Sequence, residues 1–241
     1  MISSRLFTNK GKRPSNEDHI GRIRTDNCVT FMVADGLGGH GFGEVASDIA
    51  IKSCKNAAQV FEDPIEVIEN SFVTAEQKVL ELQQSDYKYS DMMTTLVQFV
   101  IQKNIGVWGH IGDSRLYHFR RDKLISHTKD HSVPQMLVNM GEIADSDIRG
   151  HEDRNRLLKA IGTEWNGNAY EIAEPIRLKK SDSFLLCTDG FWELIEEDAM
   201  ERFLVEAETI DQWLDLMVNE IVKNGLEKDM DNYSAIAIWL G

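Results

Sequence analysis

The chain has 241 residues, of which 40 are acidic and 26 basic, giving a formal net charge of -14. That length allows one large or two small domains. The charge argues against a nucleic-acid partner, because phosphate backbones are bound by basic surfaces, and it predicts that recognition is not driven by an acidic partner. It does not exclude a phosphorylated substrate, since a bound metal ion can reverse the local sign of the charge.

The three cysteines, Cys28, Cys54 and Cys187, are widely spaced and include no CxxC pair. Neither a disulfide framework nor a thiolate metal site is therefore expected. No apolar run approaches the roughly 20 residues that a transmembrane helix needs, and the first 13 residues lack the hydrophobic region of a signal peptide. We expect a cytoplasmic protein that does not contact the membrane.

Short runs rich in β-branched and aromatic residues predict strands over residues 28–34, 96–101, 105–111, 183–187 and 234–240. Between the first two runs, apolar residues spaced by three and four predict two successive helices, over 46–60 and 65–82. A short helix is expected at Val133–Met140, and a further one over 210–221 that ends near Gly225. Two helices without an intervening strand favour α+β layers over a βαβ alternation. No linker or internal repeat divides the chain, so a single domain over residues 1–241 is expected.

Acidic residues stand where the apolar strands begin or end. Three of them follow a predicted strand, and one precedes the last strand. Because the end of one antiparallel strand adjoins the start of the next, their carboxylates can point into a shared cleft. A single Asp-Gly pair is more simply read as a tight turn, but several acidic strand ends weaken that alternative. The pattern indicates a divalent-metal site, with the candidate residues Glu17, Asp18, Asp35, Asp113, Asp189 and Asp231.

The segment from Gly36 to Gly41 satisfies the GxGxxG pattern of dinucleotide-binding proteins. Asp35 stands directly before it, where its charge would face a pyrophosphate. The following helix also leads into a second helix rather than into a parallel strand. The glycines are better explained as positions where the backbone approaches metal and substrate closely.

Five ordered segments resemble the motifs of the metal-dependent protein phosphatases of the 2C type. They are Arg13-Pro-Ser-Asn16-Glu17-Asp18, Asp35-Gly36-Leu-Gly38-Gly39-His40, Gly109-His-Ile-Gly112-Asp113-Ser114-Arg115, Asp189-Gly190-Phe-Trp and Asp231-Asn232. The resemblance implies a four-layer α-β-β-α sandwich, in which two mainly antiparallel sheets are flanked by helices. It also implies a variable flap at about residues 129–162 that influences substrate choice.

The resemblance further implies two Mg²⁺ or Mn²⁺ ions. Asp35 would bridge both; Asp189 and Asp231 would complete one site, and Glu17 and the Gly36 carbonyl the other. Asp18 would lie beside the ligands, Asp113 would bind a weaker third metal, and Arg13 would clamp the phosphate. His40 is a candidate general acid, with a metal-bound water as the alternative. Thr94 and Thr95 stand where the family often has Gly-Thr-Thr, so they are candidates to contact metal-bound water or to support the strand.

These ligands suit the chemistry. Oxygen donors are preferred by Mg²⁺ and Mn²⁺, and two such ions can activate water for in-line attack on phosphorus. The planar guanidinium of Arg13 can grip two phosphate oxygens. The expected activity is hydrolysis of phosphoserine and phosphothreonine in proteins, opposing a serine/threonine kinase, by a monomeric enzyme. The alternatives are a catalytically inactive phosphoprotein-binding module on the same fold and a two-metal nuclease, which conflicts with the net charge.

Overall fold

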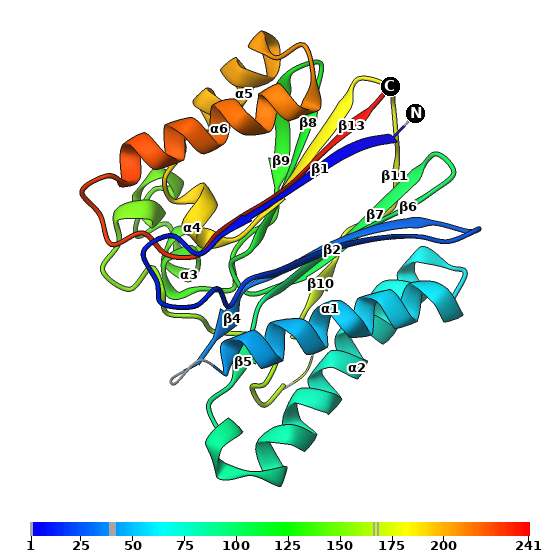
Figure 1. The fold of residues 1–241 in the computed structure, drawn as a ribbon, viewed down its shortest axis with the longest axis vertical. Coiled ribbons are helices and arrows are strands. Elements are labelled where there is room, and N and C mark those ends of the chain that lie inside the picture. Colours follow the sequence, from blue (N-terminus) through cyan, green and yellow to red (C-terminus); the bar gives the residue numbers. More distant parts are fainter. Residues whose placement is uncertain (1, 39–41, 166, 168) are drawn as a thin grey trace.

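The computed structural model describes residues 2–38, 42–165, 167 and 169–241. Two antiparallel sheets face each other and are covered on their outer sides by helices (Figure 1). The strands are β1 (Ile2–Asn9), β2 (His19–Arg24), β3 (Val29–Ala34), β4 (Gly36–Leu37), β5 (Met93–Thr94), β6 (Leu96–Gln102), β7 (Ile105–Ile111), β8 (Arg115–Arg120), β9 (Lys123–His127), β10 (Glu171–Ile172), β11 (Ile176–Arg177), β12 (Asp182–Cys187) and β13 (Tyr233–Leu240).

One sheet has the order β1-β13-β12-β8-β9, and the other has the order β10-β7-β6-β3-β2, with β11 also paired to β7. A short third pair, β4 with β5, lies beside the second sheet. The helices are α1 (Gly43–Val60), α2 (Pro64–Ser85), α3 (Val133–Met140), α4 (Asp189–Trp192), α5 (Glu197–Glu206) and α6 (Ile210–Gly225), with 3₁₀ turns at Tyr87–Tyr89 and Asp145–Gly150. The predicted α-β-β-α sandwich is confirmed.

Three apolar clusters hold the layers together. The side chains between the two sheets include Phe31, Phe99 and Phe184, and the last two rings lie 4.4 Å apart. The sheet of β3 and β6 packs its other face against α1 and α2, and the sheet of β12 and β13 packs against α5 and α6. Successive side chains along a strand therefore point alternately into the core between the two sheets and toward the helices, because strand side chains alternate between the two faces of a sheet.

Helix α2 begins where its sequence predicts. The Asp63 carboxylate accepts hydrogen bonds from the backbone N–H groups of Ile65 and Glu66, and Pro64 occupies the first turn, where its missing N–H has no cost. Helix α3 begins likewise at Ser132, whose hydroxyl accepts from Gln135, and ends at Gly141 with a φ of 76°. The boundaries of α3 agree with those expected from the sequence.

Residues 129–162 follow the edge strand β9 and return beside β5, which pairs with β4. Ile161 pairs with Thr94, and Leu157 pairs with Ser132. Helix α2 anchors the return, because the Glu76 carboxylate accepts from the Gly162 N–H at 2.6 Å. The segment, which contains α3, thus reaches the strand ends that carry the acidic residues.

Candidate metal centre

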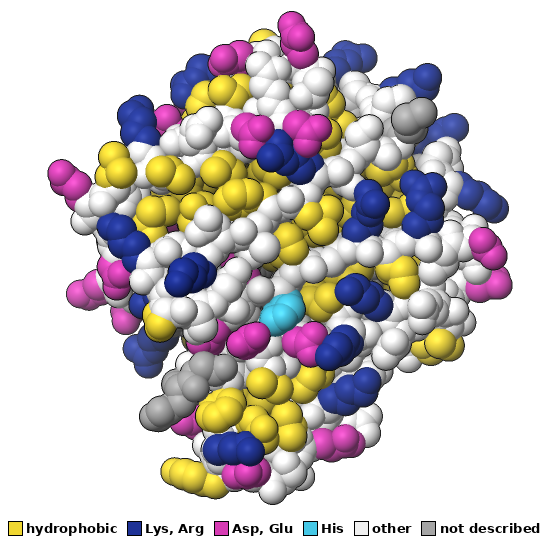
Figure 2. Space-filling model, in the orientation of Figure 1, with side chains coloured by type: hydrophobic (Ala, Val, Ile, Leu, Met, Phe, Trp, Pro, Cys, Tyr) yellow, Lys and Arg dark blue, Asp and Glu magenta, His cyan; other side chains and the backbone are white. Residues whose placement is uncertain are grey.

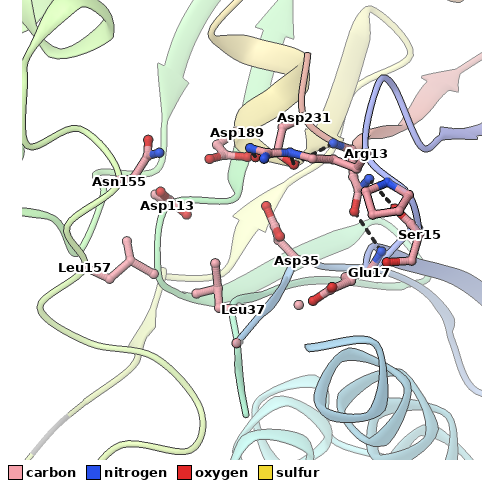
Figure 3. A pocket seen from close by; sticks show the side chains of 14 residues that line it. Arg13, Ser15, Glu17, Asp35, Leu37, Asp113, Asn155, Leu157, Asp189 and Asp231 are labelled. Atoms are coloured by element: carbon pink, nitrogen blue, oxygen red, sulfur yellow. Dashed lines mark hydrogen bonds and ion pairs between the residues drawn. The ribbon is translucent and has the colours of Figure 1, made fainter. Parts of the chain in front are cut away.

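The predicted acidic residues converge at one end of the sandwich. Asp35 follows β3, Asp113 follows β7, and Asp189 follows β12 and begins α4. Asp231 precedes β13 and Glu17 precedes β2, so antiparallel pairing brings them to the same end. Figure 3 shows these side chains around one cavity of about 580 Å³, which is also lined by Arg13, Leu37, Asn155 and Leu157. The shared cleft predicted from the sequence is therefore present.

Two glycines let the backbone segments of the site approach each other. A Cβ atom at position 190 would lie 2.1 Å from the carbonyl oxygen of Asn232. At position 36 it would lie 2.3 Å from the Gly43 carbonyl group. Both separations are far shorter than any van der Waals contact, so a side chain at either position would push apart the loops that carry the acidic residues.

The hydroxyls of Thr94 and Thr95 form hydrogen bonds with the backbone of Asp35. The backbone N–H of Asp35 donates to the Thr95 hydroxyl at 3.0 Å, and the Thr94 hydroxyl donates to the Asp35 carbonyl at 2.8 Å. Thr95 also shares a hydrogen bond of 2.7 Å with Ser114, the residue after Asp113. The structure thus gives Thr94 and Thr95 a role that the sequence did not predict, since their hydroxyls bind the backbone of the candidate ligand Asp35.

Asn232 joins the loop of residues 10–17 to the loop that precedes β13. Its amide oxygen accepts from the Glu17 N–H at 2.7 Å, and its amide nitrogen donates to the carbonyls of Lys10 and Ser15, both at 2.9 Å. Asn232 is buried, so these bonds are protected from water. The loop that carries Arg13 and Glu17 is thereby fixed to the residue next to Asp231. Asn232 stands in one of the five motifs, but no role for it was predicted from the sequence.

Asp113 is supported by a buried ion pair. The guanidinium of Arg115 donates to both carboxylate oxygens of Asp130, at 2.8 and 2.7 Å. The same guanidinium lies 3.5 Å from the ring centre of Trp192, whose indole N–H donates to the Asp113 carbonyl. Arg115 therefore connects Asp113 to the base of the segment 129–162 and to α4.

Arg13 lies across the mouth of the acidic cluster. Its guanidinium forms two parallel hydrogen bonds with the Asp231 carboxylate, at 2.9 and 2.8 Å (Figure 3). The side chain is 43% exposed, so it can still be reached from solvent. This geometry brings the predicted phosphate clamp beside a predicted metal ligand, and it neutralises one negative charge of the cluster.

Burial and mutual repulsion raise the pKa values of the acidic cluster. The pKa of Asp35 and that of Asp113 lie well above the ordinary value because both carboxyls are buried and face Asp189. Burial also raises the pKa of Asp189, and it raises the pKa of Asp18 to about 7. Such a cluster favours either bound protons or a bound cation.

The donor set fits a hard divalent ion. Five carboxylates line the cavity, those of Glu17, Asp35, Asp113, Asp189 and Asp231, and they supply the oxygen donors that Mg²⁺ and Mn²⁺ prefer. Asp18 is independent evidence for a bound cation. One of its buried carboxylate oxygens accepts a hydrogen bond from the Thr188 hydroxyl at 3.0 Å, and the other has no partner among the described residues. A buried, unpaired carboxylate oxygen is costly unless a cation or its hydration shell satisfies it.

No histidine of the described residues lines this cavity. His40 lies outside the described residues, so its role as general acid stays a prediction. His110 and His131 approach Glu171, a proximity that the sequence did not reveal. Their rings stack with an interplanar angle of 4°, so their in-plane lone pairs cannot converge on one ion. The His131 Nδ1 also accepts from the Gly112 N–H, which leaves its other nitrogen to donate to Glu171.

Comparisons with known proteins agree with this geometry. The family model described as Protein phosphatase 2C matches residues 10–232. A serine/threonine phosphatase, stp, of Listeria monocytogenes is 30% identical over 239 residues, covering 96% of this chain and 93% of that protein. Protein phosphatase PhpP of Streptococcus pneumoniae is 28% identical over 201 residues, which is 79% of each chain.

Solved structures show the same fold. The serine/threonine phosphatase Stp1 from Staphylococcus aureus superimposes with a TM-score of 0.90 at 26% identity, covering 100% of this chain and 96% of that one. The catalytic domain of PstP, solved in complex with two manganese ions, gives 0.84 at 22% identity, covering 99% and 97%. The chain belongs to the protein phosphatase 2C family, whose members are metal-dependent serine/threonine phosphatases. None of the described helices is long and apolar enough to cross a membrane.

Proposed function

We propose that the acidic cavity is the active site of a phosphatase that hydrolyses phosphoserine and phosphothreonine in proteins. One observation supports this most strongly: acidic residues from five separate strand ends line a single cavity together with Arg13. A structural ion-pair network would contain about as many cations as anions. Here one arginine faces five carboxylates, which is an arrangement suited to divalent cations and a phosphate.

The residues present fit two metal ions. Asp35 would contact both, Asp189 and Asp231 would hold one, and Glu17 with the carbonyl of Gly36 would hold the other. Asp113 would serve a third, weaker site. When bound, such ions supply an activated water and offset the charge of the phosphate.

The chain's own residues then bind and orient the substrate. Arg13 would exchange its paired hydrogen bonds with Asp231 for two oxygens of the phosphoryl group, because the planar guanidinium can donate to both at once. Asn232 keeps Arg13 and Glu17 in register with Asp231. Asp18 would accept hydrogen bonds from water near the ligands, through the oxygen that Thr188 leaves free. His40 stays a candidate general acid for the leaving oxygen.

No observation favours the inactive phosphoprotein-binding module. That reading requires the loss of a ligand, whereas every carboxylate predicted as a ligand lines the cavity. The residues 129–162 contribute Asn155 and Leu157 to its wall, and this supports our proposal that they form a flap that shapes substrate choice within a single domain. A kinase that opposes the enzyme, the monomeric state and the cytoplasmic location remain predictions from the sequence.

The test compares Asp189→Asn with Asp26→Asn, an exposed aspartate in the β2–β3 turn. Phosphate release from a phosphothreonine peptide and from a small aryl phosphate is measured with Mn²⁺ and with EDTA. Metal binding is followed separately by calorimetry. We expect metal-dependent hydrolysis that Asp189→Asn reduces at least a hundredfold, with weaker Mn²⁺ binding, while Asp26→Asn behaves as wild type. Full turnover by Asp189→Asn at saturating Mn²⁺ would refute the ligand assignment.

A further inference from the structure

The end of the sandwich opposite the metal centre carries two adjoining hollows. One, of about 580 Å³, lies between the end of α5 and the last residues of β13, and the other, of about 190 Å³, lies between the far ends of the two sheets. They share Lys180, Leu240 and Gly241. Strand β12 separates them from Asp189, and its six residues span roughly 20 Å at 3.3 Å each. This surface is therefore independent of the catalytic cavity.

Cations line these hollows in a chain that is otherwise strongly acidic. Arg121 and Lys180 border the larger hollow, and Lys103, Lys179 and Lys180 border the smaller. All four side chains are exposed, and within the described part of the chain none of them forms an ion pair. Asp122 is the one acidic side chain among the described residues that line the two hollows.

Neighbouring cations behave differently. Arg120 is paired with Asp182, at 2.6 Å, and Lys123 is paired with Glu201, at 2.7 Å. Unpaired and paired cations thus alternate along the same turn. The unpaired side chains add no ion pair to the fold. Figure 2 shows Lys and Arg side chains gathered at the upper right, where Figure 1 places both termini.

Buried Asp182 holds the cation-bearing turns in place. Its carboxylate accepts two hydrogen bonds from Arg120 and a third from the Lys179 N–H, at 2.8 Å. The Arg121 N–H donates across to the Ser181 carbonyl at 3.0 Å. The backbones that carry Arg121, Lys179 and Lys180 are therefore fixed relative to one another before any partner binds, which reduces the ordering cost of binding.

The larger hollow also has an apolar wall. Leu204, Val205 and Ala207 contribute from α5 and the residue after it, and Trp239 contributes from β13. Val205 is 68% exposed, although it lies on a helix whose other apolar side chains, Ala199, Met200, Phe203 and Leu204, are buried. An apolar wall bordered by unpaired cations matches a segment in which an apolar side chain is flanked by carboxylates.

We propose that these two hollows form a docking site for an acidic segment of a partner protein that carries an apolar residue. The occupant's carboxylates would pair with Arg121, Lys179 and Lys180, and its apolar side chain would lie against Val205 and Trp239. The site adds a local exception to the sequence-based expectation that acidic partners are not recruited, since a net charge says nothing of how the charges are distributed.

Charge and shape favour a protein segment over other occupants. A second copy of this chain would bring a net charge of -14, which repels at long range. An anionic lipid surface would meet the cations but would leave the apolar wall of a recessed hollow unfilled. A narrow acidic segment can satisfy both features.

The test measures fluorescence anisotropy of a fluorescein-labelled acidic octapeptide with a central Leu-Trp pair. A matched peptide carries amides in place of the carboxylates. The charge-reversed protein combines Arg121→Glu and Lys180→Glu, and a control reverses two exposed lysines elsewhere, Lys52→Glu on α1 and Lys78→Glu on α2. Turnover of a small aryl phosphate, which should be the same in all three proteins, shows that each is folded.

We expect the acidic peptide to bind wild type and the control alike and to bind the charge-reversed protein at least tenfold more weakly. Its affinity should fall as salt rises, and the amide peptide should bind tenfold more weakly than the acidic one. Equal losses in the control and the charge-reversed protein would overturn the proposal. So would binding only to anionic phospholipid vesicles, or concentration-dependent dimerisation that the reversal abolishes.

Discussion

Replacing Asn232 by alanine should loosen the loop that carries Arg13 and Glu17. The amide of Asn232 forms three buried hydrogen bonds to that loop, with the Glu17 N–H and with the carbonyls of Lys10 and Ser15. At about 1 kcal/mol net for each bond, the variant should lose roughly 3 kcal/mol of unfolding free energy. For a chain of this size that corresponds to a fall of about 6 to 12 °C in melting temperature.

Asn224→Ala provides a matched control, because the Asn224 amide donates a single bond, of 2.9 Å, to the Leu194 carbonyl. Its melting temperature should fall by about 2 to 4 °C. Melting is measured by calorimetry in EDTA and with Mn²⁺, and Mn²⁺ affinity is measured by titration. In Asn232→Ala the stabilisation by Mn²⁺ should also shrink, since Glu17 loses its support. Equal melting temperatures for the two variants, with unchanged Mn²⁺ affinity, would refute the reasoning.

Three further predictions concern pH and packing. Burial raises the pKa of Asp18 to about 7 and raises that of Asp35 well above its usual range, so metal-free protein binds more protons folded than unfolded. In EDTA, the urea concentration at the unfolding midpoint should therefore decrease as the pH is raised from 5 to 8, and Mn²⁺ should remove this decrease. A midpoint in EDTA that increases with pH would contradict the raised pKa values. Burial likewise raises the pKa of Glu76 to about 7. Glu76→Gln should therefore raise the melting temperature at pH 8, where the carboxylate is charged, and leave it unchanged at pH 5. Equal shifts in melting temperature at the two pH values would point to another cause. Gly190→Ala should cost about 1 to 3 kcal/mol of unfolding free energy, because its Cβ would lie 2.1 Å from the Asn232 carbonyl oxygen. Gly150→Ala, with open space around it, should cost under about 1 kcal/mol. Comparable denaturant midpoints for the two variants would show that the backbone at position 190 can adjust.

The sequence predicted several strands and helices whose apolar pattern is strong, but it missed the buried strand β8 and the helix α5. The strands over 28–34 and 105–111 and the helix Val133–Met140 agree with the structure to within one residue. Strands β1 and β2 were not predicted, because their exposed residues interrupt the apolar pattern at the edges of the sheets. Strand β1 forms because β13 pairs with it along eight residues, and such tertiary pairing leaves no local signal.

The acidic residues of the site could be predicted, but their supports could not. An acidic residue at a strand end is visible in the sequence, and antiparallel pairing then brings such residues together. The hydrogen bond from Asp35 to Thr95 joins residues 60 positions apart, and that from Glu17 to Asn232 joins residues 215 apart. The pairing of Arg13 with Asp231 likewise depends on the packed fold. Motif resemblance locates these residues without stating which atoms they bind.

The position of β13 has a consequence for biosynthesis. Strand β13 lies between β1 and β12, so β1 gains its pairing partner only after residues 233–240 have been made. Asp231 and Asn232 are also made at that late point, and the loop of Arg13 and Glu17 is fixed only by them. A nascent chain therefore has no complete acidic site before these residues have left the ribosome and β13 has paired. The enzyme cannot begin to remove phosphates before that strand is in place.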